Sequence, residues 1–474
     1  MNKQLITESQ NRDLETIIEE LSKIKEIAGD ALFEAVENRD QKNAKKLIQA
    51  GADVNFVKYN GWTPLMQASS DGQKEIAQSL IEEGADFDMQ NHDGVTALML
   101  AVENNQKEIA QSLIKGGANL DMQDEEGYTA LMVAAYEGEK EIAQILIDEG
   151  ADFDMQNHDG VTALMFAVEN NQKEIAQSLI KGGANLDMQD EGGYTALMVA
   201  ALCGHKEITQ ILIDKGARID MKNNGGLTAL MLAAKNKQKE ILDMLIKAGA
   251  YIDMKNNDGW TALMAAAYEK EKEIVQTLIE NGANLDIQDN KGWTALMLAS
   301  QENSSKEIVQ TLIDAGANLD MQDEDGYTAL MVAALWGHKE ITQILIDKGA
   351  RIDMKNNDGW TALMIAVYHK CKDIARCLLQ AGANINMQDE EGKTALMVAI
   401  EGKNPVIVQE LIEHGADILL KDNNGIDAYN LAMKKGNLEM ARMIQEAVKE
   451  GLLKRKVASQ RVGMAQNPGR QNGI

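Results

Sequence analysis

The sequence predicts an all-α fold with short finger-like β-turn loops, in which about 13 helix–turn–helix repeats stack into a solenoid. The first observation behind this prediction is a regular spacing of about 33 residues, with a single interval longer by one, between glycines at Gly61, Gly94, Gly127, Gly160, Gly193, Gly226, Gly259, Gly292, Gly326, Gly359, Gly392 and Gly425. The second is that each period holds two short helical patterns, and helices this short are marginal by themselves in water. Each repeat is therefore expected to depend on its neighbours, with which it buries one continuous core.

The first helix of a repeat is predicted from a capping residue and an apolar run. In the repeat that begins at Gly94, Thr96 can cap a helix that starts at Ala97. Residues 98–102 make this helix apolar on nearly every side, so it is expected to be buried on several sides.

The second helix of the same repeat is predicted to keep one face in water. Asn105 followed by Glu108 has the spacing of a capping box, and residues 109–114 carry one apolar stripe beside polar residues. The glycine pair 116–117 predicts a left-handed end for this helix. The polar residues 119–126 then predict a projecting turn, which we call the finger.

These features resemble the ankyrin repeat family over roughly residues 29–450. The resemblance rests on the regular glycine period, on Thr-Ala-Leu-Met at the start of the first helix, and on Gly-Ala after the second. The family usually has Thr-Pro-Leu-His at this place. In eleven repeats of this chain the last residue of the motif is Met instead, from Met66 to Met397, and the proline is kept only at Pro64. A thioether packs but does not order a hydrogen-bond network, so the bonds that the histidine makes in the family are not expected here.

Methionine recurs at a second position, in the fingers. We interpret both sets as filling the core, with a metal or redox role as the alternative. The finger set is Met89, Met122, Met155, Met188, Met221, Met254, Met321, Met354 and Met387.

The chain divides into three predicted parts. Residues 1–8 are expected to be a loose start, and residues 1–28 as a whole an N-terminal capping helix, with a partner-binding helix as the alternative. Residues 29–450 form the repeat array, and residues 451–474 are expected to be a flexible basic tail in which 454–456 could act as a nuclear transport signal. The apolar face of the N-terminal helix comprises Leu14, Ile17, Ile18, Leu21, Ile24 and Ile27.

The charge of the chain restricts its partners. The formal net charge is −27, and because residues 451–474 carry five basic side chains and no acidic one, residues 1–450 carry −32. Such a field repels nucleic acid and anionic membranes and favours a basic protein partner. Three cysteines, no secretory signal and no apolar run long enough to span a membrane predict a soluble protein in a reducing compartment, and we expect it to be cytoplasmic. We also expect it to be a monomer.

No catalytic pattern emerges from the sequence, so the protein is expected to be neither an enzyme nor a cofactor carrier. His369, Cys371 and Cys377 fall in one repeat, but no fourth ligand at zinc-site spacing accompanies them. The acidic residues recur from repeat to repeat, and no phosphate loop or nucleophile motif is present.

Tryptophan and tyrosine concentrate at two positions of the repeat, which hold all but three of the five tryptophans and nine tyrosines. The position directly after the glycine holds Trp62, Tyr128, Tyr194, Trp260, Trp293, Tyr327 and Trp360. The position nine places after the glycine, at the end of the first helix, holds Tyr136, Tyr268 and Tyr368, with Trp336 next to it. The family resemblance implies that both positions line a concave partner-binding face. The alternative is that the rings stack on one another along the row of fingers.

Acidic fingertips lie beside these rings at 124–126, 323–325 and 389–391. Rings interleaved with carboxylates suit a basic peptide, so the leading hypothesis is a scaffold for protein–protein interaction. One alternative is a reader of methylated lysine that uses Trp260, Tyr268 and Trp293 as an aromatic cage. A second alternative is a host-directed effector that acts as an adaptor after non-classical secretion into a host cell, because arrays of recently duplicated repeats recur in microbes that live within hosts.

Overall fold

The computed structural model describes residues 2–302 and 305–449, with side chains from residue 19 onward. The chain forms two compact units, divided between Tyr251 and Ile252, and each unit is described by itself. The predicted basic tail, residues 451–474, lies outside the described residues.

The described residues of the N-terminal unit form helices joined by turns and loops. In chain order these are α1 (Asn2–Glu37), α2 (Gln41–Gln49), the 3-10 helix η1 (Tyr59–Gly61), α3 (Pro64–Ser70), α4 (Lys74–Glu82), α5 (Ala97–Glu103), α6 (Lys107–Gly116), α7 (Ala130–Glu137), α8 (Lys140–Asp148), α9 (Ala163–Glu169), α10 (Lys173–Gly182), α11 (Ala196–Cys203), α12 (Lys206–Asp214), α13 (Ala229–Lys235) and α14 (Lys239–Lys247).

The C-terminal unit continues the same alternation within its described residues. It contains α15 (Ala262–Tyr268), α16 (Lys272–Glu280), α17 (Ala295–Ser300), α18 (Lys306–Asp314), α19 (Ala329–Trp336), α20 (Lys339–Asp347), α21 (Ala362–Tyr368), α22 (Lys372–Gln380), α23 (Ala395–Glu401), α24 (Pro405–Glu413), α25 (Ala428–Lys434) and a helical segment over residues 438–449.

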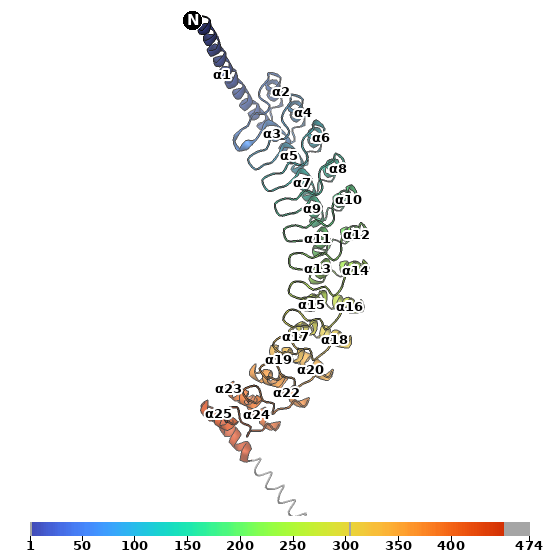
Figure 1. Ribbon diagram of the computed structural model, residues 1–474, viewed down its shortest axis with the longest axis vertical. Helices are drawn as coiled ribbons and strands as arrows, with labels where there is room; N and C mark the ends of the chain where they lie inside the picture. Colours follow the sequence, from blue (N-terminus) through green and yellow to red (C-terminus); the bar gives the residue numbers. More distant parts are fainter. Residues whose placement is uncertain (1, 303–304, 450–474) are drawn as a thin grey trace, which may run out of the picture. The chain divides into compact units, whose positions relative to one another are not determined.

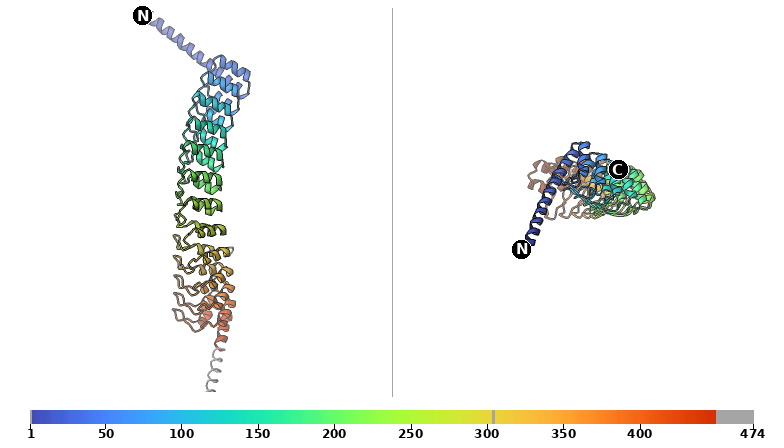
Figure 2. Two further views of the ribbon diagram at one scale, coloured as in Figure 1. Left: turned by 90° about the vertical axis from the view of Figure 1, so that its right-hand side faces the viewer. Right: turned by 90° about the horizontal axis from the view of Figure 1, so that it is seen from above.

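Within each unit the helices form two rows. First helices pack on the first helices of neighbouring repeats, for example α5 on α7, and second helices pack likewise, for example α6 on α8. Figure 1 shows the fingers on the side of the first helices that faces away from the second helices, and Figure 2 shows the stacked helices of the repeats from two further directions. The predicted all-α helix–turn–helix stack is confirmed.

The first helices begin as predicted, with a threonine cap in eleven repeats. In one of them the Thr96 hydroxyl accepts a hydrogen bond from the Met99 amide at 3.3 Å. The eleven motif methionines are 1–3% exposed, so their core role is confirmed, whereas the nine finger methionines are only half-buried. In two repeats the thioether also takes part in the cap, because Met66 and Met264 Sδ accept from the Thr63 and Thr261 amides at 3.4 Å.

The second helices begin differently from the prediction, which was wrong about the capping box. Helix α6 starts at Lys107, its N-cap is Gln106, and no side chain caps it. Asn105 instead adopts a left-handed conformation, with φ of 52°, in the tight reversal between the two helices. The reversal between the two helices needs a residue in this left-handed conformation, which asparagine tolerates. Asn105 occupies that position, one residue before the N-cap position at Gln106, and therefore cannot cap the helix. The left-handed end is confirmed at Gly117, with φ of 100°.

The opening glycine of each repeat is required by the next finger. At Gly94 the φ angle is 75°, and a Cβ atom would lie 2.6 Å from the backbone nitrogen of Glu125 in the following finger. Gly84 has a similar φ of 82°, but a Cβ atom there would meet nothing within 4 Å. The regular recurrence of the opening glycine therefore reflects a close backbone approach between successive fingers.

This pair of glycines gives a matched test. We expect Gly84→Ala to lower the free energy of unfolding by about 1 kcal/mol, because alanine is strained in the left-handed conformation. Gly94→Ala should cost more than about 2 kcal/mol, because overpacking adds to the same strain. Urea unfolding followed by circular dichroism measures both variants, and equal losses would contradict the role of close finger contact.

Helix α1 differs from the expectation for the N-terminus. It runs without a break from Asn2 to Glu37, so the loose start was wrong for residues 2–8, where no glycine or proline interrupts the helix. Leu21, Ile24 and Ile27 are 55%, 61% and 71% exposed, so these side chains do not cover the first repeat. The side chains of residues 1–18 lie outside the description, and the domain boundary at residue 28 stays a prediction. Among the described residues, none of the helices has both the length and the hydropathy that a membrane crossing needs.

Candidate functional site

The fingers are held to one another by a repeated hydrogen-bond ladder. Gln123 Nε2 donates to the Gly127 carbonyl of its own finger at 2.7 Å and to the Gln156 carbonyl of the next finger at 2.9 Å. The Asp121 carboxylate accepts from the Asp152 amide at 2.9 Å, which adds a second bond between the same two fingers. Equivalent bonds recur along both units, so each finger presents its side chains at a set distance from its neighbours.

The first acid of each acidic fingertip stabilises its own loop. Asp124 Oδ1 accepts from the Tyr128 amide at 2.7 Å and from the Glu126 amide at 3.0 Å. Asn91 makes the same two bonds in the preceding finger with a neutral amide. The loop therefore does not need the charge of Asp124, which is available to a ligand.

The predicted aromatic residues divide into two groups by exposure. The seven that follow a glycine, Trp62, Tyr128, Tyr194, Trp260, Trp293, Tyr327 and Trp360, are half-buried. The four at helix ends are exposed: Tyr136 by 52%, Tyr268 by 45%, Trp336 by 53% and Tyr368 by 57%. We call the surface made by the fingers and the ends of the first helices the finger-side surface.

Three cavities on the finger-side surface bring seven of the eleven predicted residues together. The Tyr136 cavity, of about 360 Å³, contains Tyr128 and Tyr136. The Trp293 cavity, also of about 360 Å³, contains Trp260, Tyr268 and Trp293. The Lys393 cavity, of about 420 Å³, contains Trp360, Tyr368 and Lys393. Trp62, Tyr194, Tyr327 and Trp336 line none of these three cavities.

The rings also contact one another, but not along the row of fingers. Trp260 and Tyr268 meet edge to face with ring centres 5.4 Å apart, and Trp360 and Tyr368 do the same at 5.3 Å. Each of these pairs lies within one repeat. Tyr128 stacks at 5.3 Å on the buried ring of Phe166, which belongs to the next repeat. Tyr136 meets the same Phe166 ring edge to face at 5.9 Å. Among the described residues no ring pair joins two successive finger positions.

Charged side chains complete the cavities, and the sequence reasoning missed several of them. Glu103 and Glu137 line the Tyr136 cavity, Lys291 lines the Trp293 cavity, and Glu401 lines the Lys393 cavity. Glu103 and Glu401 stand nine places after their glycines, the position that holds Tyr136 in another repeat. Variation at this position among nearly identical repeats was the signal that could have identified them.

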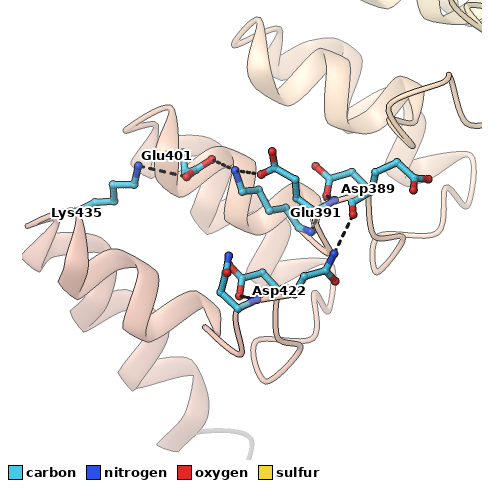
Figure 3. A network of polar contacts seen from close by, with 9 residues as sticks. Asp389, Glu391, Glu401, Asp422 and Lys435 are labelled. Carbon is cyan, nitrogen blue, oxygen red and sulfur yellow. Dashed lines mark hydrogen bonds and ion pairs between the residues drawn. The ribbon is translucent and has the colours of Figure 1, made fainter.

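Lys393 forms the best-defined polar cluster of this surface. Its ammonium lies 2.7 Å from Glu391 Oε2 and 3.0 Å from Glu401 Oε2, and Lys435 pairs with the other oxygen of Glu401 at 3.3 Å (Figure 3). The hydrogen bond with Glu391, aided by Glu401, raises the pKa of Lys393 despite partial burial. Burial opposes ionisation of Glu401, but hydrogen bonds from Lys393 and Lys435 outweigh it and lower the Glu401 pKa.

This cluster predicts sensitivity to acid. Because the folded pKa of Glu401 lies below its unfolded value of about 4.3, the pairing contributes stability above that pH and loses it as the pH falls further. Lys393→Met should flatten this acid loss, since it removes one of the two partners of Glu401. Melting temperatures between pH 7 and pH 3 measure the effect. Lys291→Met is the control, because Lys291 forms no ion pair with any described side chain, and an unchanged slope for Lys393→Met would contradict the prediction.

The histidines and cysteines of the described residues form neither a metal site nor a disulfide bond. His205 and His338 ring nitrogens contact the carbonyls of Glu169 and Gln301 at 3.1 and 2.8 Å, in the repeat before. Within the described residues no group of three histidine, cysteine or acidic side chains could hold a metal ion. The three cysteines are unpaired, and burial raises the pKa of the Cys203 and Cys371 thiols.

Comparison with known proteins gives one clear result. A family model described as "Ankyrin repeats (3 copies)" matches six overlapping segments, residues 32–124, 99–190, 164–256, 230–323, 297–389 and 378–451. Together these matches cover most of the chain, including all three cavities. No curated protein matches the chain.

Proposed function

Because this chain belongs to the ankyrin repeat family, whose repeats act as scaffolds for protein–protein interaction, we propose that it binds a partner protein through its finger-side surface. The protein acts in this proposal without catalysis of its own. The partner presents a basic segment that lies across several fingers of one unit.

One observation carries this proposal. The three cavities each combine rings with carboxylates at equivalent places, between the fingertip and the ends of two successive first helices. Tryptophan and tyrosine contribute most at interface hot spots, because they bury large apolar area with few rotatable bonds. Carboxylates beside them add attraction for lysine and arginine, whose cations also bind over ring faces.

The charge of the repeat array supports a basic protein as the partner. A formal charge of −32 over residues 1–450 accelerates encounter with a cationic segment and opposes binding to nucleic acid. Acidic fingertips such as residues 323–325 place part of this charge beside Tyr327. Burial, with added repulsion from Asp358, Asp323 and Asp325, raises the pKa of the Tyr327 hydroxyl, as a negative local field requires.

The proposal is tested by identifying what the protein binds. Mass spectrometry of proteins that co-purify with the full-length chain supplies candidates, and calorimetry with each purified candidate supplies a dissociation constant. We expect this constant to rise at least fivefold between 50 and 300 mM NaCl, because salt screens exposed charges. A true partner whose affinity does not depend on salt would contradict the role of the acidic surface.

A second candidate function follows from the Trp293 cavity. This cavity brings together Trp260, Tyr268 and Trp293 beside Asp258 and Asp289, which is the composition of a cage for a methylated ammonium group. The Trp260 indole donates to Asp289 at 3.1 Å, so the ring and the carboxylate are held together. A trimethyllysine peptide should then bind more tightly than its unmethylated form. Equal affinities would eliminate this candidate.

A further inference from the structure

The Tyr136 cavity differs from the other two in its charge balance. Four carboxylates line it, those of Glu103, Asp124, Glu126 and Glu137, and no lysine, arginine or histidine does. Glu103, Glu126 and Glu137 form no ion pair with any other described side chain. Each of the other two cavities contains a lysine of the chain itself, Lys291 or Lys393.

The Lys393 cavity shows what such a site accepts. Its lysine ammonium lies between a fingertip acid, Glu391, and a helix-end acid, Glu401, at 2.7 and 3.0 Å. Glu126 holds the same place in its finger as Glu391, directly before the next opening glycine. Glu103 and Glu137 supply helix-end carboxylates from the two sides of the Tyr136 cavity. Both cavities thus combine a fingertip carboxylate with a helix-end carboxylate, but the places of Lys393 and Glu401 are taken by Tyr128 and Tyr136 in the Tyr136 cavity, which contains no cation of the chain.

We infer that the Tyr136 cavity receives the unmethylated ammonium group of a lysine side chain from the partner protein. The apolar part of that side chain lies over the exposed ring of Tyr136, and its ammonium donates hydrogen bonds to the carboxylates, as Lys393 does. A trimethylated ammonium lacks these donors, so the site selects the unmodified form. This inference rests on the proposed function and names the chemistry of one of its contacts.

The electrostatics of the cavity agree with this chemistry. Burial, with added repulsion from Glu126, Asp159 and Asp124, raises the pKa of the Tyr128 hydroxyl against the effect of its hydrogen bond with Asn157. The carboxylates therefore act on groups inside the cavity in addition to facing water. A cation that enters is attracted by the same field.

A second place in the chain, 66 residues further along, is equivalent to the Tyr136 cavity but lacks two of its carboxylates and the Tyr136 ring. The repeats at 94–126 and 160–192 differ at only two positions, yet the place equivalent to the Tyr136 cavity in the second copy carries different residues. Val95, Glu103, Asp124 and Tyr128 are preserved there as Val161, Glu169, Asp190 and Tyr194. Glu126, Tyr136 and Glu137 are replaced by Gly192, Leu202 and Cys203.

The first experiment uses the full-length chain with 3-fluorotyrosine at Tyr128, observed by fluorine NMR. The probe is Nα-acetyl-lysine N-methylamide, compared with its Nε-acetyl and Nε-trimethyl forms. We expect a saturable shift with the lysine form and at least tenfold weaker binding of both modified forms, because one lacks the charge and the other lacks the donors. Equal binding of the three forms, or no saturable shift with lysine, would overturn the inference.

The matched variant carries Glu126→Gly, Tyr136→Leu and Glu137→Cys, which are the residues of the second copy. Because the chain already folds with these residues in that copy, the variant should keep its helix content, while the loss of the contact between Tyr136 and Phe166 should lower its melting temperature by a few degrees at most. The lysine probe should bind at least tenfold more weakly to it. Unchanged binding would show that the carboxylates and the ring are not the site.

A second variant tests the same chemistry by gain of function. Lys393→Ala empties the Lys393 cavity but keeps Glu391, Glu401, Trp360 and Tyr368. With 5-fluorotryptophan at Trp360, the probe should cause a saturable shift in Lys393→Ala and none in the parent chain. A shift of equal size in both proteins, or in neither, would contradict the inference. These probes need no partner, so their failure leaves the proposed function intact, and that function is tested separately by partner binding.

Discussion

Replacing Trp260 and Trp293 with alanine together is expected to weaken partner binding at least tenfold while the helix content stays unchanged. Both indoles line one cavity from successive repeats and are half-buried, so each presents a fixed face to a ligand. Truncation of a single hot-spot tryptophan typically costs about 2 kcal/mol or more. The helix beside Trp260 is capped by Thr261 and anchored by buried Leu263 and Met264, so the secondary structure does not depend on the ring.

Calorimetry with the identified partner measures this effect, and circular dichroism checks the fold. Tyr251→Ala is the matched control, because Tyr251 is 66% exposed but occupies neither aromatic position of the repeat. Its loss should change the affinity by less than a factor of two. If the double variant binds as the parent does, the two indoles serve only to pack against their neighbours.

Leu197→Ala is expected to destabilise the N-terminal unit by about 3 kcal/mol. Leu197 is 1% exposed in α11, a helix that packs on the neighbouring first helices α9 and α13, so truncation of this side chain leaves a cavity in the stack. Since each repeat is stabilised mainly by its neighbours, a cavity at one interface should weaken the adjoining repeats as well.

The same helix supplies the control for this prediction. Leu202 is 39% exposed, so Leu202→Ala changes the same residue type in α11 with much less loss of buried area. We expect a cost below about 1 kcal/mol for it, measured by urea unfolding as for Leu197→Ala. Equal costs would mean that burial in the stack is not what stabilises these repeats.

The sequence predicted the first helices well because their signals are local. Thr96 caps α5 through an atom three residues away, and the apolar run that follows can only be buried. The beginning of the second helix was predicted less well. Asn105 and Glu108 have the spacing of a capping box, but Asn105 lies in the tight reversal after the first helix, so the N-cap of the second helix is the next residue, Gln106. The sequence also left open whether the apolar residues of α1 cover the first repeat or stay exposed, because exposure depends on what the rest of the chain covers, and Leu21, Ile24 and Ile27 are exposed.

The candidate site was predicted only in part, because the sequence shows which positions recur but does not show which residues of different repeats meet. The aromatic positions were visible as recurrences in a repeated sequence, and seven of those eleven residues line the three cavities. Glu103 and Glu401 were missed, because each acts with a residue of another repeat or finger, and the sequence alone does not pair them.

By itself the sequence determined the repeat, its helices and the acidic, aromatic character of the fingers, since these follow from period, local capping and composition. Only the tertiary structure decided which side chains share a cavity, because residues of successive repeats meet when a finger approaches the next at backbone distance, as Gly94 does with Glu125. It also decided which carboxylates already hold a cation. Glu391 and Glu401 hold Lys393, whereas Glu126 and Glu137 pair with no described side chain and remain available to a ligand.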